Sequence, residues 1–217
     1  MIRIAIDGPG GAGKSTIAKA VAAKLGIDYI DTGAMYRAVG YKAAKEEIDV
    51  RDENALKQML DKTEIDFSRG NIILDGKTVN EEIRTPAMSS MASRVSSMGV
   101  VREKLVSLQK KMGQTKSVIM DGRDIGTNVM PDAEYKFYMT ASPEERAKRR
   151  YDEMFLKGRD VRYEDVLADI NKRDHADMTR KINPLRQADD AVLLDTTGMT
   201  IEQVVDTIIK EIDNGSC

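Results

Sequence analysis

A glycine-rich loop between an apolar strand and a helix constrains the fold of this chain more than any other feature of its sequence. Residues 2–6 are apolar and rich in β-branched side chains, which is typical of a buried parallel strand. Residues 8–15 read Gly-Pro-Gly-Gly-Ala-Gly-Lys-Ser and fit the pattern G-x-x-x-x-G-K-[ST]. From Ser15, apolar residues recur at helical spacing until Gly26 ends the helix. Residues 29–30 predict a second strand, so the chain opens with a βαβ unit.

This loop has the chemistry of a phosphate-binding site. Glycines accept positive φ angles, so successive backbone N–H groups can converge on phosphate oxygens, and the following helix N-terminus favours an anion. Lys14 is expected to bridge the outer phosphates of a nucleoside triphosphate, and the Ser15 hydroxyl to bind Mg²⁺. The alternative is a glycine-rich turn that only starts a helix, but the flanking strand and helix favour the binding site. The residues expected to bind the triphosphate are Gly8, Pro9, Gly10, Gly11, Ala12, Gly13, Lys14, Ser15 and Thr16.

The composition excludes several classes of protein. The chain has 217 residues, with 34 Lys and Arg against 36 Asp and Glu, so nucleic acid is not an expected partner. The single cysteine, Cys217, excludes an intramolecular disulfide framework and suits a reducing cytoplasm. The single histidine, His175, excludes a His-rich metal site, and we interpret it as a surface helix residue. No run of about 18 apolar residues occurs, so no membrane association through a spanning helix is expected.

The rest of the chain predicts an α/β fold. Residues 117–120, 135–139 and 191–194 predict three further core strands. Residues 88–112 have helical patterning, and so does the segment that follows Thr200. Five parallel strands with intervening helices make a doubly wound α/β fold, and the length fits one domain.

Two local patterns add detail to this fold. Residues 64–79 alternate apolar with polar side chains, and Asp75-Gly76 is a hairpin signal, so we expect a small antiparallel insert. Ser142 is expected to be a helix N-cap, with Pro143 at the first helical position and Glu145 closing a capping box.

Two further motifs bear on the class of nucleotide-binding protein. Residues 117–121 predict an apolar strand that ends in aspartate, so Asp121 could hold Mg²⁺ through water or could simply cap the next turn. Residues 171–174 match N-K-x-D, the guanine-reading motif of GTP switches. In that class the motif follows a buried strand, whereas here it follows residues 163–170, which have helical spacing. We therefore interpret the second match as coincidence.

Arginines cluster late in the chain. Arg146, Arg149 and Arg150 share one face of the helix that starts at Ser142, and Arg159 follows in a loop-like segment. A solvated, salt-bridged surface is one interpretation. A lid that closes over phosphates is the other, because guanidinium groups there neutralise charge on a transferred phosphoryl group. On the second interpretation, the residues that act on the transferred group are Lys14, Arg123, Arg150 and Arg159.

Four motifs after the loop resemble those of bacterial cytidylate kinases. They are residues 31–37 (Asp-Thr-Gly-Ala-Met-Tyr-Arg), 83–85 (Ile-Arg-Thr), 121–127 (Asp-Gly-Arg-Asp-Ile-Gly-Thr) and 173–180, which carry Arg-Asp-x-x-Asp-x-x-Arg. The resemblance runs from Ile2 to Ile212. It implies a P-loop kinase fold and a Mg²⁺-dependent, direct in-line transfer of the γ-phosphoryl group of ATP to CMP or dCMP, in pyrimidine metabolism. It also implies a monomer in the cytoplasm.

The resemblance further implies that different segments of the single domain bind the acceptor and close the site. Residues 33–100 would cover the nucleoside monophosphate, and residues 151–165 would form a lid. The acceptor phosphate would be held by Arg37 and Arg123, the cytosine by Thr32, Arg102, Asp124 and Arg180, and the sugar by Ser93, Arg173 and Asp177.

The chemistry of such a reaction agrees with a chain that holds one histidine. A phosphate monoester with a second pKa near ~6 is already mostly a dianion at neutral pH, so no general base is required. Asp124 would accept a hydrogen bond from the cytosine amine and repel the carbonyl of uracil. A kinase with another monophosphate or a hydroxyl acceptor, for which Asp124 would be the candidate base, and a nucleotide-dependent switch are the alternatives.

Overall fold

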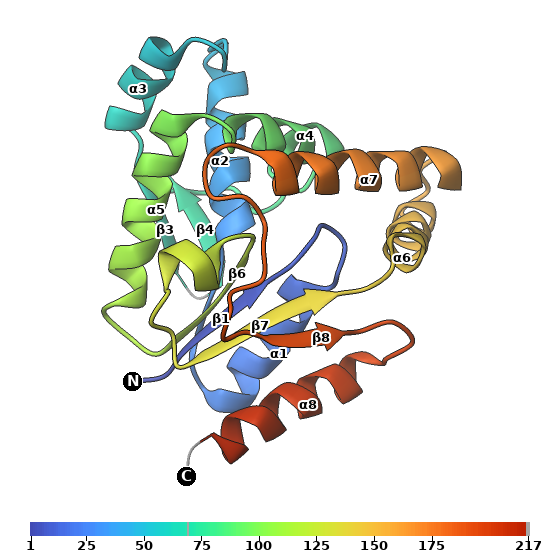
Figure 1. Ribbon diagram of the computed structural model, residues 1–217. Coiled ribbons are helices and arrows are strands. Elements are labelled where there is room, and N and C mark those ends of the chain that lie inside the picture. Colours follow the sequence, from blue (N-terminus) through green and yellow to red (C-terminus); the bar gives the residue numbers. More distant parts are fainter. Residues whose placement is uncertain (69, 216–217) are drawn as a thin grey trace. The chain divides into compact units, whose positions relative to one another are not determined.

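The computed structural model describes residues 1–68 and 70–215, and Figure 1 shows its helices and strands. Cys217 lies outside the described residues. The chain divides into two compact units, residues 1–27 with 118 onward, and residues 28–117. The elements of the first unit are β1 (Arg3–Asp7), α1 (Lys14–Leu25), β6 (Val118–Gly122), the π-helix η1 (Ile125–Val129), β7 (Tyr135–Thr140), α6 (Pro143–Leu156), α7 (Tyr163–Thr179), β8 (Val192–Asp195) and α8 (Ile201–Asn214). Those of the second are β2 (Asp28–Asp31), α2 (Thr32–Lys45), α3 (Glu53–Asp61), β3 (Ile65–Ser68), β4 (Asn71–Leu74), β5 (Lys77–Thr78), α4 (Pro86–Val95) and α5 (Gly99–Gly113).

The main sheet has five strands in the order β2-β6-β1-β7-β8, which confirms the predicted α/β fold. The pairings of β1 with β6, of β1 with β7 and of β7 with β8 are parallel. In the centre Ile4 lies opposite Ile119, and at the carboxyl edge Asp7 lies opposite Gly122. Since ligands of such sheets bind beyond the carboxyl ends of the strands, this edge is where the site is expected.

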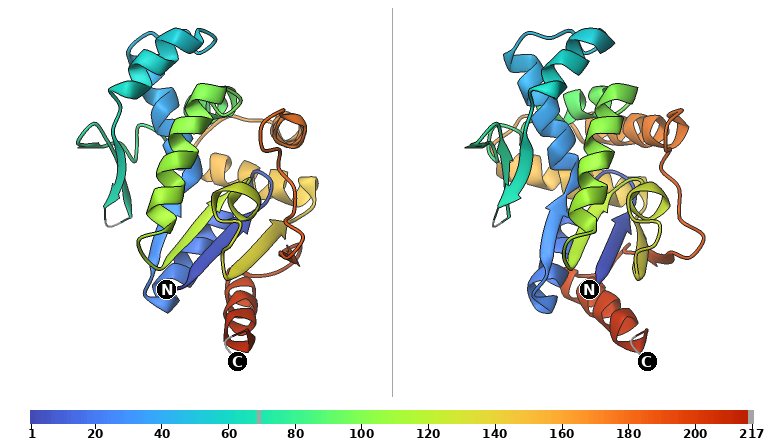
Figure 2. Two further views of the ribbon diagram at one scale, coloured as in Figure 1. Left: turned by 60° about the vertical axis from the view of Figure 1, so that its left-hand side comes forward. Right: turned by 90° about the vertical axis from the view of Figure 1, so that its left-hand side faces the viewer.

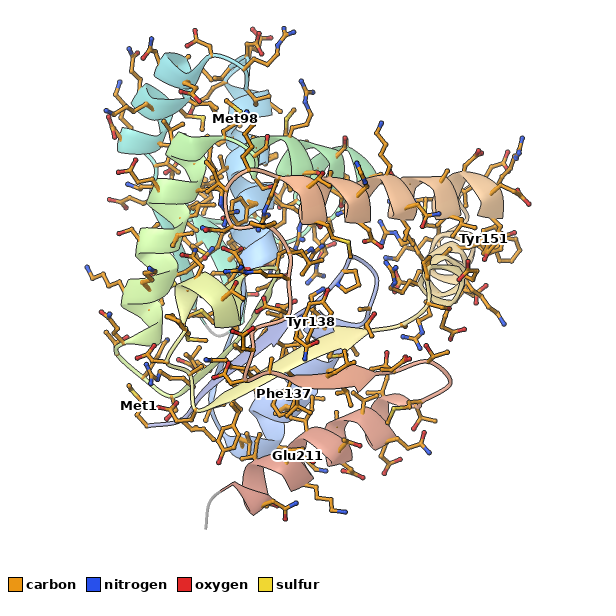
Figure 3. The ribbon with its side chains drawn as sticks, in the orientation of Figure 1. Met1, Met98, Phe137, Tyr138, Tyr151 and Glu211 are labelled. Atoms are coloured by element: carbon orange, nitrogen blue, oxygen red, sulfur yellow. The ribbon has the colours of Figure 1, made fainter. Side chains whose placement is uncertain are left out.

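Helices cover the first unit's strands. Helices α1 and α8 lie side by side on one face (Figures 1 and 2). The neighbours Phe137 and Tyr138 point to opposite sides of β7, as the alternation of a strand requires (Figure 3). Helices α6 and α7 pack on each other through Ala147, Val166 and Ile170. None of the helices in the described part of the chain has the length and apolar character needed to span a membrane.

The second unit has its own core and its own small sheet. The predicted insert is confirmed, because β3, β4 and β5 form an antiparallel sheet. Asp75 and Gly76 form its turn with φ angles of 49° and 77°, the left-handed values that a two-residue hairpin requires. The helices pack around a core that includes Met35, Val39 and Leu105, each of which is fully buried.

The helical patterning predicted for residues 88–112 is confirmed, and two helices share this stretch. Helix α4 ends at Val95, and α5 begins at Gly99. Between them the hydroxyl of Ser96 donates to the Ser93 carbonyl at 2.9 Å, and the hydroxyl of Ser97 donates to the Arg94 carbonyl at 2.7 Å. Serine side chains that bind nearby backbone groups compete with helical hydrogen bonds, which explains the break.

The start of α6 is confirmed in part. The Glu145 N–H donates to Ser142 Oγ at 3.2 Å, and Pro143 is in the first turn, as predicted. The second half of the capping box is absent, because the Ser142 N–H donates to Thr197 Oγ1 at 3.3 Å. The Glu145 side chain instead accepts from Arg149. A complete capping box occurs at α8, between Thr200 and Gln203.

Candidate active site

The predicted phosphate loop joins β1 to α1, with glycine where the backbone demands it. Gly8 has a φ of 149°, and a Cβ there would lie 1.9 Å from the Met139 carbonyl oxygen, so no side chain fits. Gly13 has a φ of 85° and precedes the first residue of α1. A Cβ at Gly10, in contrast, would make only an ordinary contact of 3.6 Å with Arg123 Nη2. The loop therefore begins tightly packed against β7 and passes beside the Arg123 guanidinium.

Lys14 is a buried cation that points back into this loop. It is 5% exposed, and its Nζ donates to the Pro9 carbonyl oxygen at 2.7 Å. Burial and the nearby positive charge of Arg123 lower the pKa of Lys14 well below its ordinary value, against the opposing effect of Asp121 and Asp7. An ammonium that lacks water in this way gains strongly from a polyanion.

Ser15 and Asp121 lie together at the start of α1 and the end of β6. The Ser15 hydroxyl donates to Asp121 Oδ2 at 2.8 Å, and Asp121 is buried. No group of three or more His, Cys, Asp or Glu residues that could hold a metal occurs in residues 1–68 and 70–215. Mg²⁺ in nucleotide sites needs few protein ligands, because water and phosphate oxygens supply the rest. One hydroxyl beside one carboxylate therefore fits this ion.

Arg123 forms an ion pair with Asp177 of α7. The Arg123 Nε donates to Asp177 Oδ2 at 2.7 Å. Burial alone would raise the pKa of Asp177, but the charge of Arg123 and this hydrogen bond lower it. Burial alone would lower the pKa of Arg123, but the charge of Asp177 and its hydrogen bond raise it above the ordinary value. The pair fixes Arg123 at the side of the phosphate loop.

Asp124 and Arg180 form a second, deeper pair. Arg180 Nη2 donates to Asp124 Oδ1 at 3.0 Å, and each side chain is only 8% exposed. Asp124 Oδ2 accepts from Asn128 Nδ2 at 3.0 Å, and Arg180 Nε donates to the Asn183 carbonyl at 2.7 Å. The first unit thus brings together the predicted residues Lys14, Ser15, Asp121, Arg123, Asp124, Asp177 and Arg180.

The remaining predicted arginines of this unit lie on or near α6 and α7. Arg173 precedes Asp174 on α7, and burial together with the positive charges of Arg123 and Arg150 lowers its pKa. Arg150 lies on α6 and donates to Glu153 of the same helix at 3.4 Å. Arg159 lies in the loop between α6 and α7, where its N–H donates to the Met154 carbonyl at 3.1 Å. The segment predicted as a lid therefore contains the end of α6, a loop and the start of α7.

The second unit contains the other predicted residues. Thr32 is the buried first residue of α2, and Asp31 caps this helix by accepting from the Ala34 N–H at 2.8 Å. Arg37 Nη2 donates to Asp31 Oδ2 at 2.8 Å, so Asp31 also orients Arg37. A Cβ at Gly33 would lie 3.2 Å from both Arg37 Nη1 and Asp31 Oδ1, which leaves little room for a side chain.

Arg102 and Ser93 belong to this unit too. Arg102 lies on α5, is 2% exposed and has its guanidinium carbon 5.9 Å from the centroid of the Tyr36 ring, a cation–π contact. Ser93 lies half-buried on α4. A buried guanidinium on an aromatic face is suited to a planar ligand edge.

Three buried residues of the first unit were missed by sequence reasoning. Arg146 was grouped with the arginines of a basic face, yet it is 3% exposed and its Nη1 donates to the Gly10 carbonyl of the phosphate loop at 2.9 Å. Its partner Asp174 was treated only as part of a motif. Asp7 is 4% exposed, and burial raises its pKa to about 6. A carboxylate at the end of an apolar strand, directly before the loop, was the available signal for Asp7.

The match to N-K-x-D is confirmed as coincidental. Residues 171–174 lie within α7, so they do not follow a strand as in GTP switches. His175 is exposed on the same helix, as expected. Nothing in this helix therefore favours a guanine-reading site.

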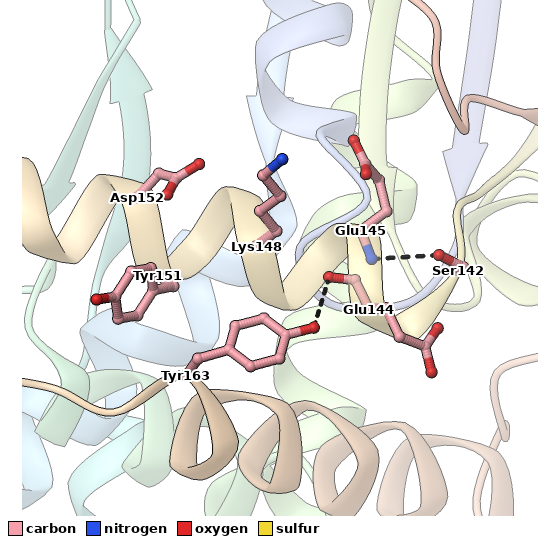
Figure 4. A pocket seen from close by; sticks show the side chains of 7 residues that line it. All are labelled: Ser142, Glu144, Glu145, Lys148, Tyr151, Asp152 and Tyr163. Atoms are coloured by element: carbon pink, nitrogen blue, oxygen red, sulfur yellow. Dashed lines mark hydrogen bonds between the residues drawn. The ribbon is translucent and has the colours of Figure 1, made fainter.

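A surface pocket of about 500 Å³ also lies on this unit, between α6 and α7 (Figure 4). Tyr163 Oη donates to the Glu144 carbonyl at 3.3 Å across it, and Tyr151 meets Tyr163 edge to face. It is lined by Ser142, Glu144, Glu145, Lys148, Tyr151, Asp152 and Tyr163. None of these was predicted to contact a substrate, although Tyr151, Asp152 and Tyr163 lie in the segment predicted as a lid.

The parallel sheet and the loop that carries Lys14 and Ser15 define a P-loop kinase class of protein. A shikimate kinase from Bacteroides thetaiotaomicron shares the fold, with a TM-score of 0.50 and 14% sequence identity over 98% of both chains. Residues 4–214 match the family described as Cytidylate kinase. The chain is 52% identical over 97% of both sequences to a cytidylate kinase of Clostridioides difficile, and 51% identical to one of Caldanaerobacter subterraneus, over 97% of this chain and 94% of that one. The chain belongs to the cytidylate kinase family.

Proposed function

We propose that this protein transfers the γ-phosphoryl group of ATP to CMP or dCMP, giving ADP with CDP or dCDP. The observation that carries the proposal is the family match over residues 4–214, which includes the phosphate loop and every other predicted site residue. Relatives named cytidylate kinase match along nearly their whole length, so no part of the chain needs a separate activity.

The phosphate loop is proposed to hold the donor. Residues 8–16 would surround the phosphates of ATP and bind them through their backbone N–H groups, which every one of them except Pro9 carries. Lys14 would exchange the Pro9 carbonyl for a phosphate oxygen. Because Lys14 is buried, its charge acts on that phosphate with little screening by water.

Mg²⁺ is proposed to bind at Ser15 and, through water, at Asp121, where it would neutralise charge on the donor phosphates. For its part, Ser15 would turn its hydroxyl oxygen toward the cation, and Asp121 would accept hydrogen bonds from bound water. The existing contact of 2.8 Å places both groups for these tasks.

The acceptor needs orientation and counter-charge more than activation. A monophosphate is largely dianionic at neutral pH, so its oxygen can attack without a general base. Arg123 is fixed by Asp177 beside the loop, and Arg37 is fixed by Asp31, so each guanidinium is held for a bidentate phosphate contact. We propose that Arg150 and Arg159 add positive charge as the transfer proceeds, and that Arg173 with Asp177 and Ser93 contacts the sugar.

Base choice is assigned to Asp124, with Arg180, Arg102 and Thr32. The Asp124 carboxylate would accept from the cytosine amine, whereas it would repel the carbonyl that uracil has at that position. The ion pair with Arg180 holds the Asp124 carboxylate in place in its buried position. Arg102, a rigid planar donor, suits the ring acceptors of cytosine.

We propose further that residues 33–100 cover the acceptor, that residues 151–165 close as a lid, and that both serve one functional domain. Loop residues 157–162 between α6 and α7 support the second assignment, because a short loop between helices is where closure can occur. We propose a monomer in the cytoplasm, as the resemblance to cytidylate kinases implies. The net charge of -2 gives no reason to expect a nucleic-acid partner.

A panel of acceptors tests the proposal. Purified protein with ATP and Mg²⁺ is incubated with CMP, dCMP, UMP, AMP or shikimate, and ADP and the phosphorylated product are both measured. CDP and dCDP should form fastest, and chelation of Mg²⁺ should stop the reaction. Phosphorylation of another acceptor in preference to CMP and dCMP, or ADP release that no acceptor increases, would overturn the assignment.

A further inference from the structure

Asp7 makes a contact that connects the start of the phosphate loop to a distant segment. It ends β1, directly before Gly8, and is 4% exposed. Its Oδ1 accepts from the Ile125 N–H at 2.8 Å, and its Oδ2 accepts from the Gly126 N–H at 2.7 Å. Both oxygens of one buried carboxylate are therefore used by the first two residues of η1.

This contact replaces one that Asp124 would ordinarily make. Asp124 directly precedes η1, and an aspartate in that position usually accepts an N–H from the first turn of its own helix. Here the Asp124 side chain makes no such capping hydrogen bond. The N–H groups of Ile125 and Gly126 are turned to Asp7 instead, so a residue 118 positions away supplies the anion for this turn.

Asp124 consequently directs its carboxylate elsewhere. Its Oδ1 accepts from Arg180, and its Oδ2 accepts from Asn128. In this orientation the carboxylate lies with Arg180, the residue with which it is proposed to bind the base. If it turned to cap η1, it would leave Arg180.

The fit around Gly126 shows how closely the two segments approach. A Cβ at Gly126 would lie 3.4 Å from Asp7 Oδ2 and 3.3 Å from Lys136 Cδ. These distances are tighter than ordinary contacts, so a methyl group there would press the turn away from Asp7. The chain therefore offers a second site at which the same contact can be weakened.

We propose that Asp7 is a positioning residue for acceptor selection: by accepting the N–H groups of Ile125 and Gly126, it leaves the Asp124 carboxylate directed to Arg180 and available to the base. This inference rests on the proposed function, because it concerns the choice between CMP and UMP. Asp7 itself touches no substrate in this scheme. Its effect on the reaction passes through Asp124.

The main test substitutes Asp7→Asn, which keeps the size of the side chain but turns one acceptor into a donor that faces an N–H. The ratio of kcat/KM for CMP to that for UMP is measured. We expect this ratio to fall by about tenfold or more, since a hydrogen bond to a charged group is lost at the turn that orients Asp124. A role limited to stability would lower both kcat/KM values alike and leave the ratio unchanged.

Asp195→Asn is the matched control. Asp195 also ends a strand of the main sheet and accepts a backbone N–H, that of Thr197 at 2.9 Å, and it lies outside the segments proposed to bind or cover a substrate. The ratio should remain at the wild-type value in this variant. The double variant Asp7→Asn/Asp124→Asn should show the same ratio as Asp124→Asn alone, because two residues that act through one contact are not additive.

Each outcome decides the inference. A wild-type ratio in Asp7→Asn, or additive effects in the double variant, would overturn it while CDP formation by the wild-type protein still supported the proposed function. If Asp7→Asn does not fold, Gly126→Ala is measured in its place, and an unchanged ratio there has the same meaning. Failure of the wild-type protein to phosphorylate CMP would instead reject the proposed function, and the inference with it.

Discussion

Arg146 and Asp174 form an ion pair with 2.7 Å between Arg146 Nη2 and Asp174 Oδ2, and both residues are buried. The same guanidinium donates to the Gly10 carbonyl in the phosphate loop and to the Ala141 carbonyl after β7, each at 2.9 Å. One side chain thus joins the loop, the end of a core strand and α7. Asp174 lies between Arg173 and Asp177, so the helix with the proposed acceptor-binding residues is tied to the loop that holds the donor.

We expect Arg146→Lys to lower both stability and affinity for ATP. Lysine keeps the charge but cannot reach the Gly10 carbonyl, the Ala141 carbonyl and Asp174 together, so buried partners are left unsatisfied. The free energy of unfolding should fall by about 2–4 kcal/mol, and KM for ATP should rise. Urea denaturation and steady-state kinetics measure the two effects. Arg149→Lys, on a less buried arginine of the same helix, is the control and should change both quantities little.

Lys14→Ala should give a folded protein with very low turnover. The substitution removes the buried ammonium that is proposed to stabilise the transferred phosphoryl group, and such a loss costs on the order of 10²–10³ in kcat. The free energy of unfolding should fall little, because burial of the Lys14 cation is itself destabilising, as its lowered pKa indicates. Circular dichroism melts and kcat for CMP test both statements. Lys19→Ala, on the exposed face of α1, should retain activity, and near-native kcat in Lys14→Ala would remove Lys14 from the mechanism.

Asp124→Asn should weaken the discrimination of cytosine from uracil. The amide that replaces the carboxylate can donate to the uracil carbonyl, so the preference should drop by roughly 1–3 kcal/mol, or tenfold or more. The measurement is kcat/KM for CMP and for UMP in the variant and the wild-type protein. An unchanged ratio would assign base choice to other residues, such as Arg102.

The stability of the wild-type protein relative to Asp7→Asn should depend on pH. Burial raises the pKa of Asp7 to about 6, above the ordinary value of 3.8. Between these values the folded protein binds a proton that the unfolded chain does not, so the contribution of Asp7 to stability is fully present below pH 3.8 and is lost as pH rises through 6. From pH 4 to pH 7, the unfolding free energy of the wild-type protein should therefore fall by about 2–3 kcal/mol relative to that of Asp7→Asn. Urea titrations at several pH values measure it, and a constant difference would show that the Asp7 carboxylate is not perturbed.

The predictions that rest on local sequence patterns agree best with the structure. The strand, loop and helix over residues 2–26 were predicted because their glycines, Lys14 and apolar periodicity act within a few residues of one another. The Asp75-Gly76 turn was predicted for the same reason. The helical pattern of residues 88–112 gave no sign of the break between two helices, which lies where serine side chains bind the backbone. The capping box predicted at Ser142 is incomplete because the Ser142 N–H donates to Thr197.

The parts that could not be predicted depend on contacts between distant residues. Helical spacing places Arg146, Arg149 and Arg150 on one face, but only tertiary packing decides that Arg146 is buried against Gly10 while Arg150 pairs with Glu153. The contact of Asp7 with η1 likewise joins residues that are remote in sequence. The roles of the individual site residues, including those of the proposed lid, stay predictions until they are measured.

The glycines of the phosphate loop differ in how much room they leave for a side chain, and this difference determines which positions can be substituted. Gly8 is held so closely by the Met139 carbonyl that an alanine there would have to displace a central strand. Gly10 has room for a methyl group, and that group would lie against Arg123. Directed-evolution libraries that aim to alter the handling of phosphate should therefore leave position 8 invariant and place their diversity at position 10.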